Sequence, residues 1–88
     1  MAVVSREEIA AYCRYDEEAM IDEAMAMAET MESRLKRKGA VDTAATHADF
    51  CLAVKAMTLH ELDHPGEKIP QGIQDMINEL KFVKHKEA

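Results

Sequence analysis

Apolar residues in the stretch 48–62 fall on two opposite sides of a predicted helix. At about 100° per residue, one side carries Phe50, Val54 and Met57, and the other carries Leu52, Ala56 and Leu59. A helix that is apolar on both sides has to be covered on both sides. A chain of 88 residues buries only about 60–65% of its unfolded surface, so its other elements offer little surface with which to cover both sides of this helix.

This surplus predicts a contact with another copy of the chain. We assign the side with the bulky aromatic Phe50 to the core of the subunit. The subunit interface is then predicted on the other side of the helix, at Leu52, Ala56 and Leu59.

Three- and four-residue spacing of apolar positions recurs along the rest of the chain, and no segment alternates as a strand would. The sequence therefore predicts an all-α fold, a small bundle without a sheet, in one domain of residues 1–88. The two long and two shorter helices are expected at about 6–13, 17–38, 47–63 and 70–83.

Local signals place the helix ends. Ser5 and Glu8 have the spacing of a capping box, and Val4 can pack on Ile9 as a hydrophobic staple. Asp16 is a candidate cap for the second helix.

The later boundaries depend on glycine, threonine and proline. Gly39 suits the left-handed residue that ends a helix, and Thr46 with Asp49 is a candidate cap for the third helix. Pro65 disfavours helical geometry at the residue before it, and Pro70 suits the first turn of the last helix.

The second helix carries an apolar stripe rich in methionine, whose unbranched side chain suits either a core or an adaptable binding groove. The stripe consists of Met20, Ala24, Met27, Ala28, Met31 and Leu35. The core interpretation is the ordinary one. The alternative is a small partner-binding adaptor without enzymatic activity that uses Met20, Met27 and Met31.

The charge argues against nonspecific binding of nucleic acid. Eleven basic and seventeen acidic residues give a net charge of -6. The basic group Arg34, Lys36, Arg37 and Lys38 ends a predicted helix, where positive charge complements the helix dipole. No signal peptide or membrane span is predicted.

Cys13 and Cys51 lack CxxC spacing and are expected to be reduced thiols. No histidine is recognisable beside either of them, so a nucleophilic thiol is not expected. No phosphate-binding loop is present, and the sequence predicts no catalytic residue and no cofactor.

A literal H-E-x-x-H motif spans His60, Glu61 and His64. In zinc peptidases this spacing places two imidazoles around a metal and a glutamate as the base. Here Pro65 directly follows the second histidine and should disturb the turn that brings the rings together. Further ligands would have to come from Glu67, Asp75, Glu79 and His85. We therefore predict no metal site, and a zinc hydrolase is the least favoured interpretation.

The order of these features resembles the phage head-tail connector proteins, also called DNA-packaging adaptors. The resemblance lies in Val4–Ile9, in Tyr12–Asp16, in the apolar helix Phe50–Glu61 and in Ile69–Ile73, which is similar to the Pro-x-Gly-hydrophobic entry to that family's last helix. It covers about residues 4–83. The short loop after the apolar helix and Cys13 before Arg14 depart from the family pattern.

The resemblance implies a virion structural protein of a phage or prophage, present in the host cytoplasm during assembly. Such a subunit would form an oligomeric ring below the portal, where it extends the DNA channel and attaches the tail. Its expected partners are further copies of itself, the portal and tail-completion proteins, with DNA passing through without specific binding. No membrane partner is expected.

Overall fold

The computed structural model describes residues 3–40 and 42–86, with side chains described as far as Lys81. These ranges contain helices and connecting segments but no strand. The helices are α1 Arg6–Cys13, α2 Glu18–Arg37, α3 His47–Asp63 and α4 Gln71–Lys86. The prediction of an all-α bundle is confirmed, and α4 runs three residues beyond its predicted end at residue 83.

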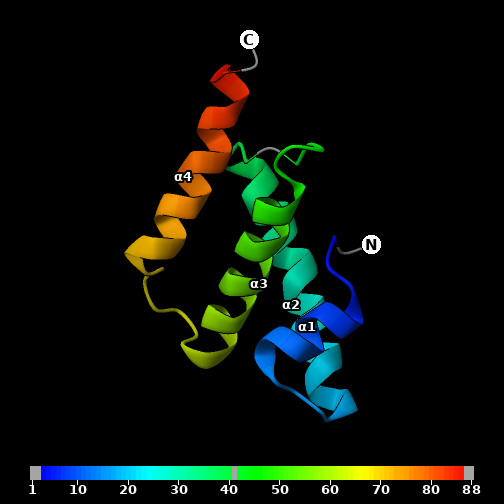
Figure 1. Ribbon diagram of the computed structural model, residues 1–88. Coiled ribbons are helices and arrows are strands. Elements are labelled where there is room, and N and C mark those ends of the chain that lie inside the picture. The colour runs from blue at the N-terminus through cyan, green and yellow to red at the C-terminus, as the bar shows by residue number, and fades with distance from the viewer. Residues whose placement is uncertain (1–2, 41, 87–88) are drawn as a thin grey trace.

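α3 lies at the centre of the bundle. α2 and α3 run in opposite directions side by side, and α4 returns along another side of α3 (Figure 1). α1 packs against both α2 and α3, whereas α4 packs chiefly on α3. The C-terminal turns of α4 extend past the end of the bundle in Figure 1. The helix with apolar residues on two sides is therefore the one that touches every other helix.

The start of α1 is built as its sequence predicts. The Glu8 backbone N–H donates to Ser5 Oγ at 3.1 Å, and the Ser5 N–H donates to Glu8 Oε1 at 3.0 Å. Val4 and Ile9 are both buried in the core. This capping box anchors the segment before α1 against the bundle.

The ends of α1 and α2 use two left-handed residues. Arg14 ends α1 with φ of 60°, where glycine is the commoner choice. Gly39 follows α2 with φ of 98°, as predicted. Any residue with a side chain would be strained at this φ value. Space is not the obstacle, because a Cβ atom at Gly39 would lie 4.0 Å from Lys81 Cγ.

Three boundary predictions need correction. Glu17, not Asp16, is the N-cap residue of α2, and its side chain makes no capping bond. Thr46 is the N-cap residue of α3, but its hydroxyl accepts from the Thr43 N–H at 2.8 Å instead of capping the helix with Asp49. α4 begins one residue after Pro70, whose carbonyl accepts from the Ile73 and Gln74 N–H groups, each at 3.1 Å. Each correction concerns one residue or one side-chain bond at a helix start, where the flanking loop affects the boundary.

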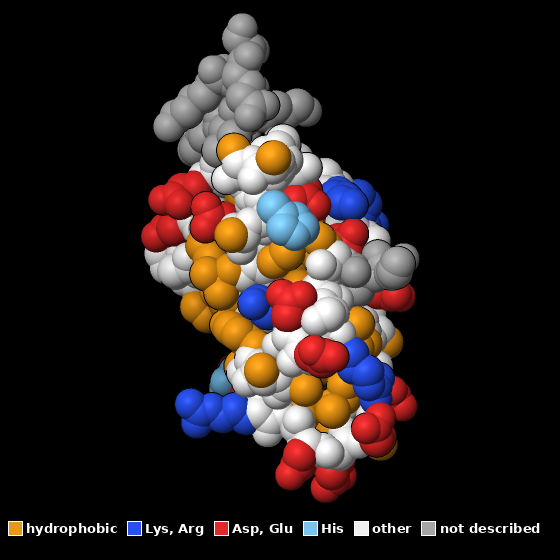
Figure 2. Space-filling view, turned by 45° about the vertical axis from the view of Figure 1, so that its right-hand side comes forward, with side chains coloured by type: hydrophobic (Ala, Val, Ile, Leu, Met, Phe, Trp, Pro, Cys, Tyr) orange, Lys and Arg blue, Asp and Glu red, His pale blue; other side chains and the backbone are white. Residues whose placement is uncertain are grey.

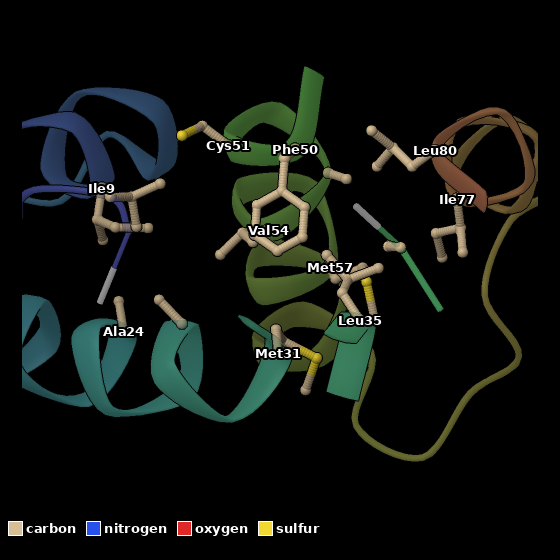
Figure 3. Close-up of a cluster of buried hydrophobic side chains, with 14 of the residues drawn as sticks. Ile9, Ala24, Met31, Leu35, Phe50, Cys51, Val54, Met57, Ile77 and Leu80 are labelled. Carbon is tan, nitrogen blue, oxygen red and sulfur yellow. The ribbon is translucent and has the colours of Figure 1, made fainter. Parts of the chain in front are cut away.

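The core is a single cluster between the helices. Phe50, Val54 and Met57 of α3 are buried as predicted, and Figure 3 shows them between side chains of α1, α2 and α4. The buried residues from α2 are Ile21, Ala24, Ala28, Met31 and Leu35. The predicted stripe is therefore largely correct, except that Met20 is 40% exposed and Met27 is only partly buried.

Candidate functional site

The side of α3 opposite the core is the candidate site. Leu52, one of the three predicted interface residues, is 40% exposed. Leu59, seven residues later on the same side, is half-buried. Ala56 is only 8% exposed, so the subunit itself covers more of this side than the sequence predicts. An exposed leucine on its own is ordinary, and the surroundings decide whether it belongs to a surface patch.

An open groove of about 510 Å³ continues from this side of α3. We call it the α3 groove. Its lining is mostly apolar and comes from three helices and the loop before α4: Tyr12, Ala56, Leu59, His60, Asp63, Pro70, Gly72, Ile73 and Met76. Two of the predicted interface residues, Ala56 and Leu59, thus lie together in the groove, and Leu52 lies one helical turn before Ala56.

The walls of the α3 groove come from α1 and α4. Tyr12 of α1 is 36% exposed, and the Lys55 ammonium lies 5.7 Å from the centroid of its ring, a cation–π contact. Ile73 and Met76 stand on the α4 side and are partly buried. The groove is thus formed because α1 and α4 flank α3 without meeting over it.

Tyr12, Ile73 and Met76 were not predicted to belong to this site. Ile73 and Met76 share one apolar stripe of α4 with the buried Ile77 and Leu80. Spacing alone predicts one continuous stripe, whereas the crossing of α4 on α3 divides it into a buried part and a groove-lining part.

The charge pattern at the surface is mixed. Figure 2 shows hydrophobic side chains reaching the surface as a strip, and acidic groups lie in the middle of that face as well as toward its ends. Lys and Arg occur there singly, not as one continuous basic field. At the end of α2, Arg34, Lys36 and Arg37 stand in the last turn, where the helix dipole favours them.

The H-E-x-x-H segment forms a helix end that holds the next loop. α3 ends at Asp63, and His64, with φ of -135° and ψ of 63°, lies outside helical geometry, as Pro65 predicts. The His64 N–H still donates to the His60 carbonyl at 2.7 Å, so the last turn before Pro65 is closed. The two imidazole rings are 5.5 Å apart between centroids.

The partners of these side chains are protein groups. Glu61 Oε2 accepts from the Gly66 N–H at 2.9 Å, and His64 Nδ1 lies 2.7 Å from Glu67 Oε2. Among the residues whose placement is described, no set of three or more His, Cys, Asp or Glu side chains could hold a metal ion. His85, a candidate ligand from the sequence, lies outside the described side chains.

Cys51 has a histidine beside it, which contradicts the sequence-based expectation. His47 Nε2 lies 3.4 Å from Cys51 Sγ, and His47 Nδ1 lies 2.9 Å from Asp42 Oδ1. The signal that could have found this pair is the spacing of four residues between His47 and Cys51 at the start of a helix.

Cys13 and Cys51 are both free thiols, as expected. They are similarly buried, at 9% and 6% exposure. Burial, the largest cause in both cases, raises the pKa of each thiol above its ordinary value. The two cysteines therefore share a desolvated setting but differ in their polar neighbours.

Comparison with protein-family models, with curated proteins and with solved structures gives no match to this chain. Among the described residues, none of the helices combines the length and the apolar content needed to cross a bilayer. A functional proposal has to come from the α3 groove and from the sequence pattern.

Proposed function

We propose that the protein is a phage head-tail connector subunit, which forms an oligomeric ring below the portal for DNA passage and tail attachment. The observation that carries this proposal is the apolar side of α3, where a 40% exposed Leu52 adjoins the α3 groove. A small all-α subunit with this surface fits an assembly in which each copy contributes one face to the next.

Ring formation requires a heterologous contact. A head-to-tail interface repeated by rotation closes into a ring, so one surface of each subunit has to accept a different surface of its neighbour. The α3 groove is concave and lined by three helices, which suits it to receive a convex element. Shape and apolar lining both support its use as the receiving surface.

The net charge of -6 supports the same role. A conduit for DNA should avoid phosphate contacts that would hold the polymer in place. We expect no retention of double-stranded DNA in a binding assay at low salt, and tight retention would contradict a passive channel.

The test is the association state of Leu52→Gln. Burying a leucine contributes about 1.5–3 kcal/mol, which corresponds to a change of about tenfold to a hundredfold in a dissociation constant. We expect sedimentation of the wild-type chain to show concentration-dependent assembly, with closed rings in electron micrographs. Leu52→Gln should raise the protein concentration needed for assembly at least tenfold, in line with the loss of this free energy of association.

Met20→Gln is the matched control. Met20 is as exposed as Leu52 but lies on α2, outside the α3 groove. It should assemble like the wild type. A wild-type chain that stays monomeric at every concentration, or equal weakening by both substitutions, would contradict the proposal.

A partner-binding adaptor is the second candidate, and the α3 groove is the observation that favours it. The groove could seat an amphipathic helix of another protein. The binding surface of such an adaptor would be the α3 groove and not the methionine stripe, because Met31 is 2% exposed and unable to contact a partner. A lasting monomer that binds an apolar helix through Leu59 would favour this function over the ring.

A further inference from the structure

Two polar contacts join the side chains of Cys51, His47 and Asp42 at the start of α3. Cys51 Sγ lies 3.4 Å from His47 Nε2, and His47 Nδ1 lies 2.9 Å from Asp42 Oδ1. An ionised carboxylate can only accept, so this contact assigns the ring proton to Nδ1. Nε2 is then left with its lone pair directed at the thiol, where it can accept the S–H proton.

We propose that Cys51 is a reactive thiol, with His47 as its base, and that low-molecular-weight disulfides modify it by thiol–disulfide exchange. His47 acts directly on the thiol proton. Asp42 is a positioning residue, since it orients the ring and touches neither sulfur nor reagent.

The exchange balances without a further reactant. The Cys51 proton passes to His47 Nε2 while Sγ attacks one sulfur of the reagent, and the S–S bond of the reagent breaks. The departing thiolate takes the proton from the imidazolium and leaves as a thiol. Cys51 is oxidised to a mixed disulfide, and the other half of the reagent is reduced.

Access to Cys51 Sγ is set by two neighbours. Cys51 is only 6% exposed, but the His47 side chain that contacts its sulfur is 56% exposed. On another side the Val3 carbonyl lies 4.0 Å from Sγ, and the Val3 N–H is held by Glu32 Oε1 at 2.6 Å. A small reagent can approach past His47, whereas a bulky one would have to displace the segment at Val3.

Charge near Cys51 selects the reagent. Glu8 of α1, Glu32 of α2 and Asp42 before α3 place negative charge around the sulfur, against Lys55 on its own helix. A cationic disulfide is therefore favoured over an anionic one of the same size. Cystamine is a suitable cationic probe, and dithiodiglycolate is its anionic counterpart.

Cys13 provides an internal reference. It is about as buried as Cys51, and burial raises the pKa of both thiols, but no histidine contact is found for Cys13 within the described side chains. At pH 7.5 we expect cystamine to modify Cys51 at least about tenfold faster than Cys13, as measured by peptide mass spectrometry.

His47→Gln tests the role of the base. Its Cys51 rate should fall to the Cys13 rate, while the Cys13 rate, which reports any loosening of the fold, stays unchanged. Asp42→Asn should lower the Cys51 rate in part, because an amide can donate to Nδ1 as well as accept from it and no longer fixes the ring proton there. Asp42→Glu, which keeps a carboxylate acceptor for Nδ1–H, should retain more of the rate.

Two results would overturn the proposal. One is an equal rate at the two cysteines of the wild type. The other is a Cys51 rate that His47→Gln leaves unchanged. Faster reaction with dithiodiglycolate than with cystamine would overturn the assignment of a cationic reagent.

Discussion

The two apolar sides of α3 differ in how completely the subunit buries them. Phe50, Val54 and Met57 are almost completely buried against the neighbouring helices. On the other side Leu52 is 40% exposed and Leu59 lines an open groove. Both sides have the composition of a core, but only one of them is fully covered by the chain.

The difference follows from the number of covering elements. Side chains of α1, α2 and α4 together cover one side of α3, whereas on the other side α1, with only eight residues, and α4 leave an open groove between them. Fold stability should therefore depend on the closed side, and association should depend on the open side. The following substitutions test that division.

Phe50→Ala should have the largest effect. Phe50 is fully buried, so its truncation leaves a cavity and removes transfer free energy. We expect a loss of about 3–5 kcal/mol in the free energy of unfolding, measured by urea denaturation followed by circular dichroism. A loss below about 1 kcal/mol would mean that the closed side is no better packed than the open one.

Leu80→Ala tests the attachment of α4. Leu80 is 2% exposed and packs in the core cluster with α3. We expect a loss of about 2–5 kcal/mol in urea denaturation. Met76→Ala, on the groove side of the same helix, is the matched control and should cost clearly less. Equal losses would mean that the groove wall is as tightly packed as the core.

Ser5→Ala tests the helix that forms the other wall. It removes the acceptor of the Glu8 N–H, and loss of such a cap costs about 1 kcal/mol. The same denaturation assay measures it. Ser5→Gly should cost only a few tenths of a kcal/mol. An alanine variant as stable as the wild type would show that α1 does not depend on its cap.

The Glu8 carboxylate should give a smaller, pH-dependent effect. Its hydrogen bonds from the Ser5 backbone, and then from the Ser5 side chain, lower its pKa from the ordinary value of 4.5. The unfolded chain then binds more protons in this range, so the stabilisation is present above pH 4.5 and is lost as pH falls through the lowered pKa. Glu8→Gln should flatten this part of the stability profile between about pH 5 and pH 3. An unchanged profile would contradict the assignment.

Leu52→Gln should have the smallest effect on folding. Its side chain already contacts water, so the free energy of unfolding of the monomer should change by no more than about 0.5 kcal/mol. Measured at a concentration below assembly, this value isolates folding from association. A loss comparable to that of Phe50→Ala would remove the distinction between the two sides.

Much of the fold follows from local features of the sequence. Apolar spacing gave the four helices in order, and the Ser5 and Glu8 pair gave the start of α1. Caps with several polar candidates were less predictable. Asp16 and Glu17 are both plausible caps by type, and the path of the turn after Arg14 decides which one stands at the boundary.

The candidate site was only partly predictable. Spacing on α3 identifies Leu52, Ala56 and Leu59 as one side, but it does not reveal that Ala56 is buried by its own chain. Nor does it show that Tyr12 and Met76 lie beside Leu59. These neighbours are distant in sequence, and only the packing of α1 and α4 on α3 brings them together.

By itself, the sequence determined where helices form and that α3 carries apolar residues on two sides, because both depend on neighbours within a few residues. The tertiary structure alone decided which side is closed, where the groove opens and which polar groups meet at Cys51. Those outcomes depend on the angles and lengths of helices that cross one another, and on a loop that brings Asp42 to His47.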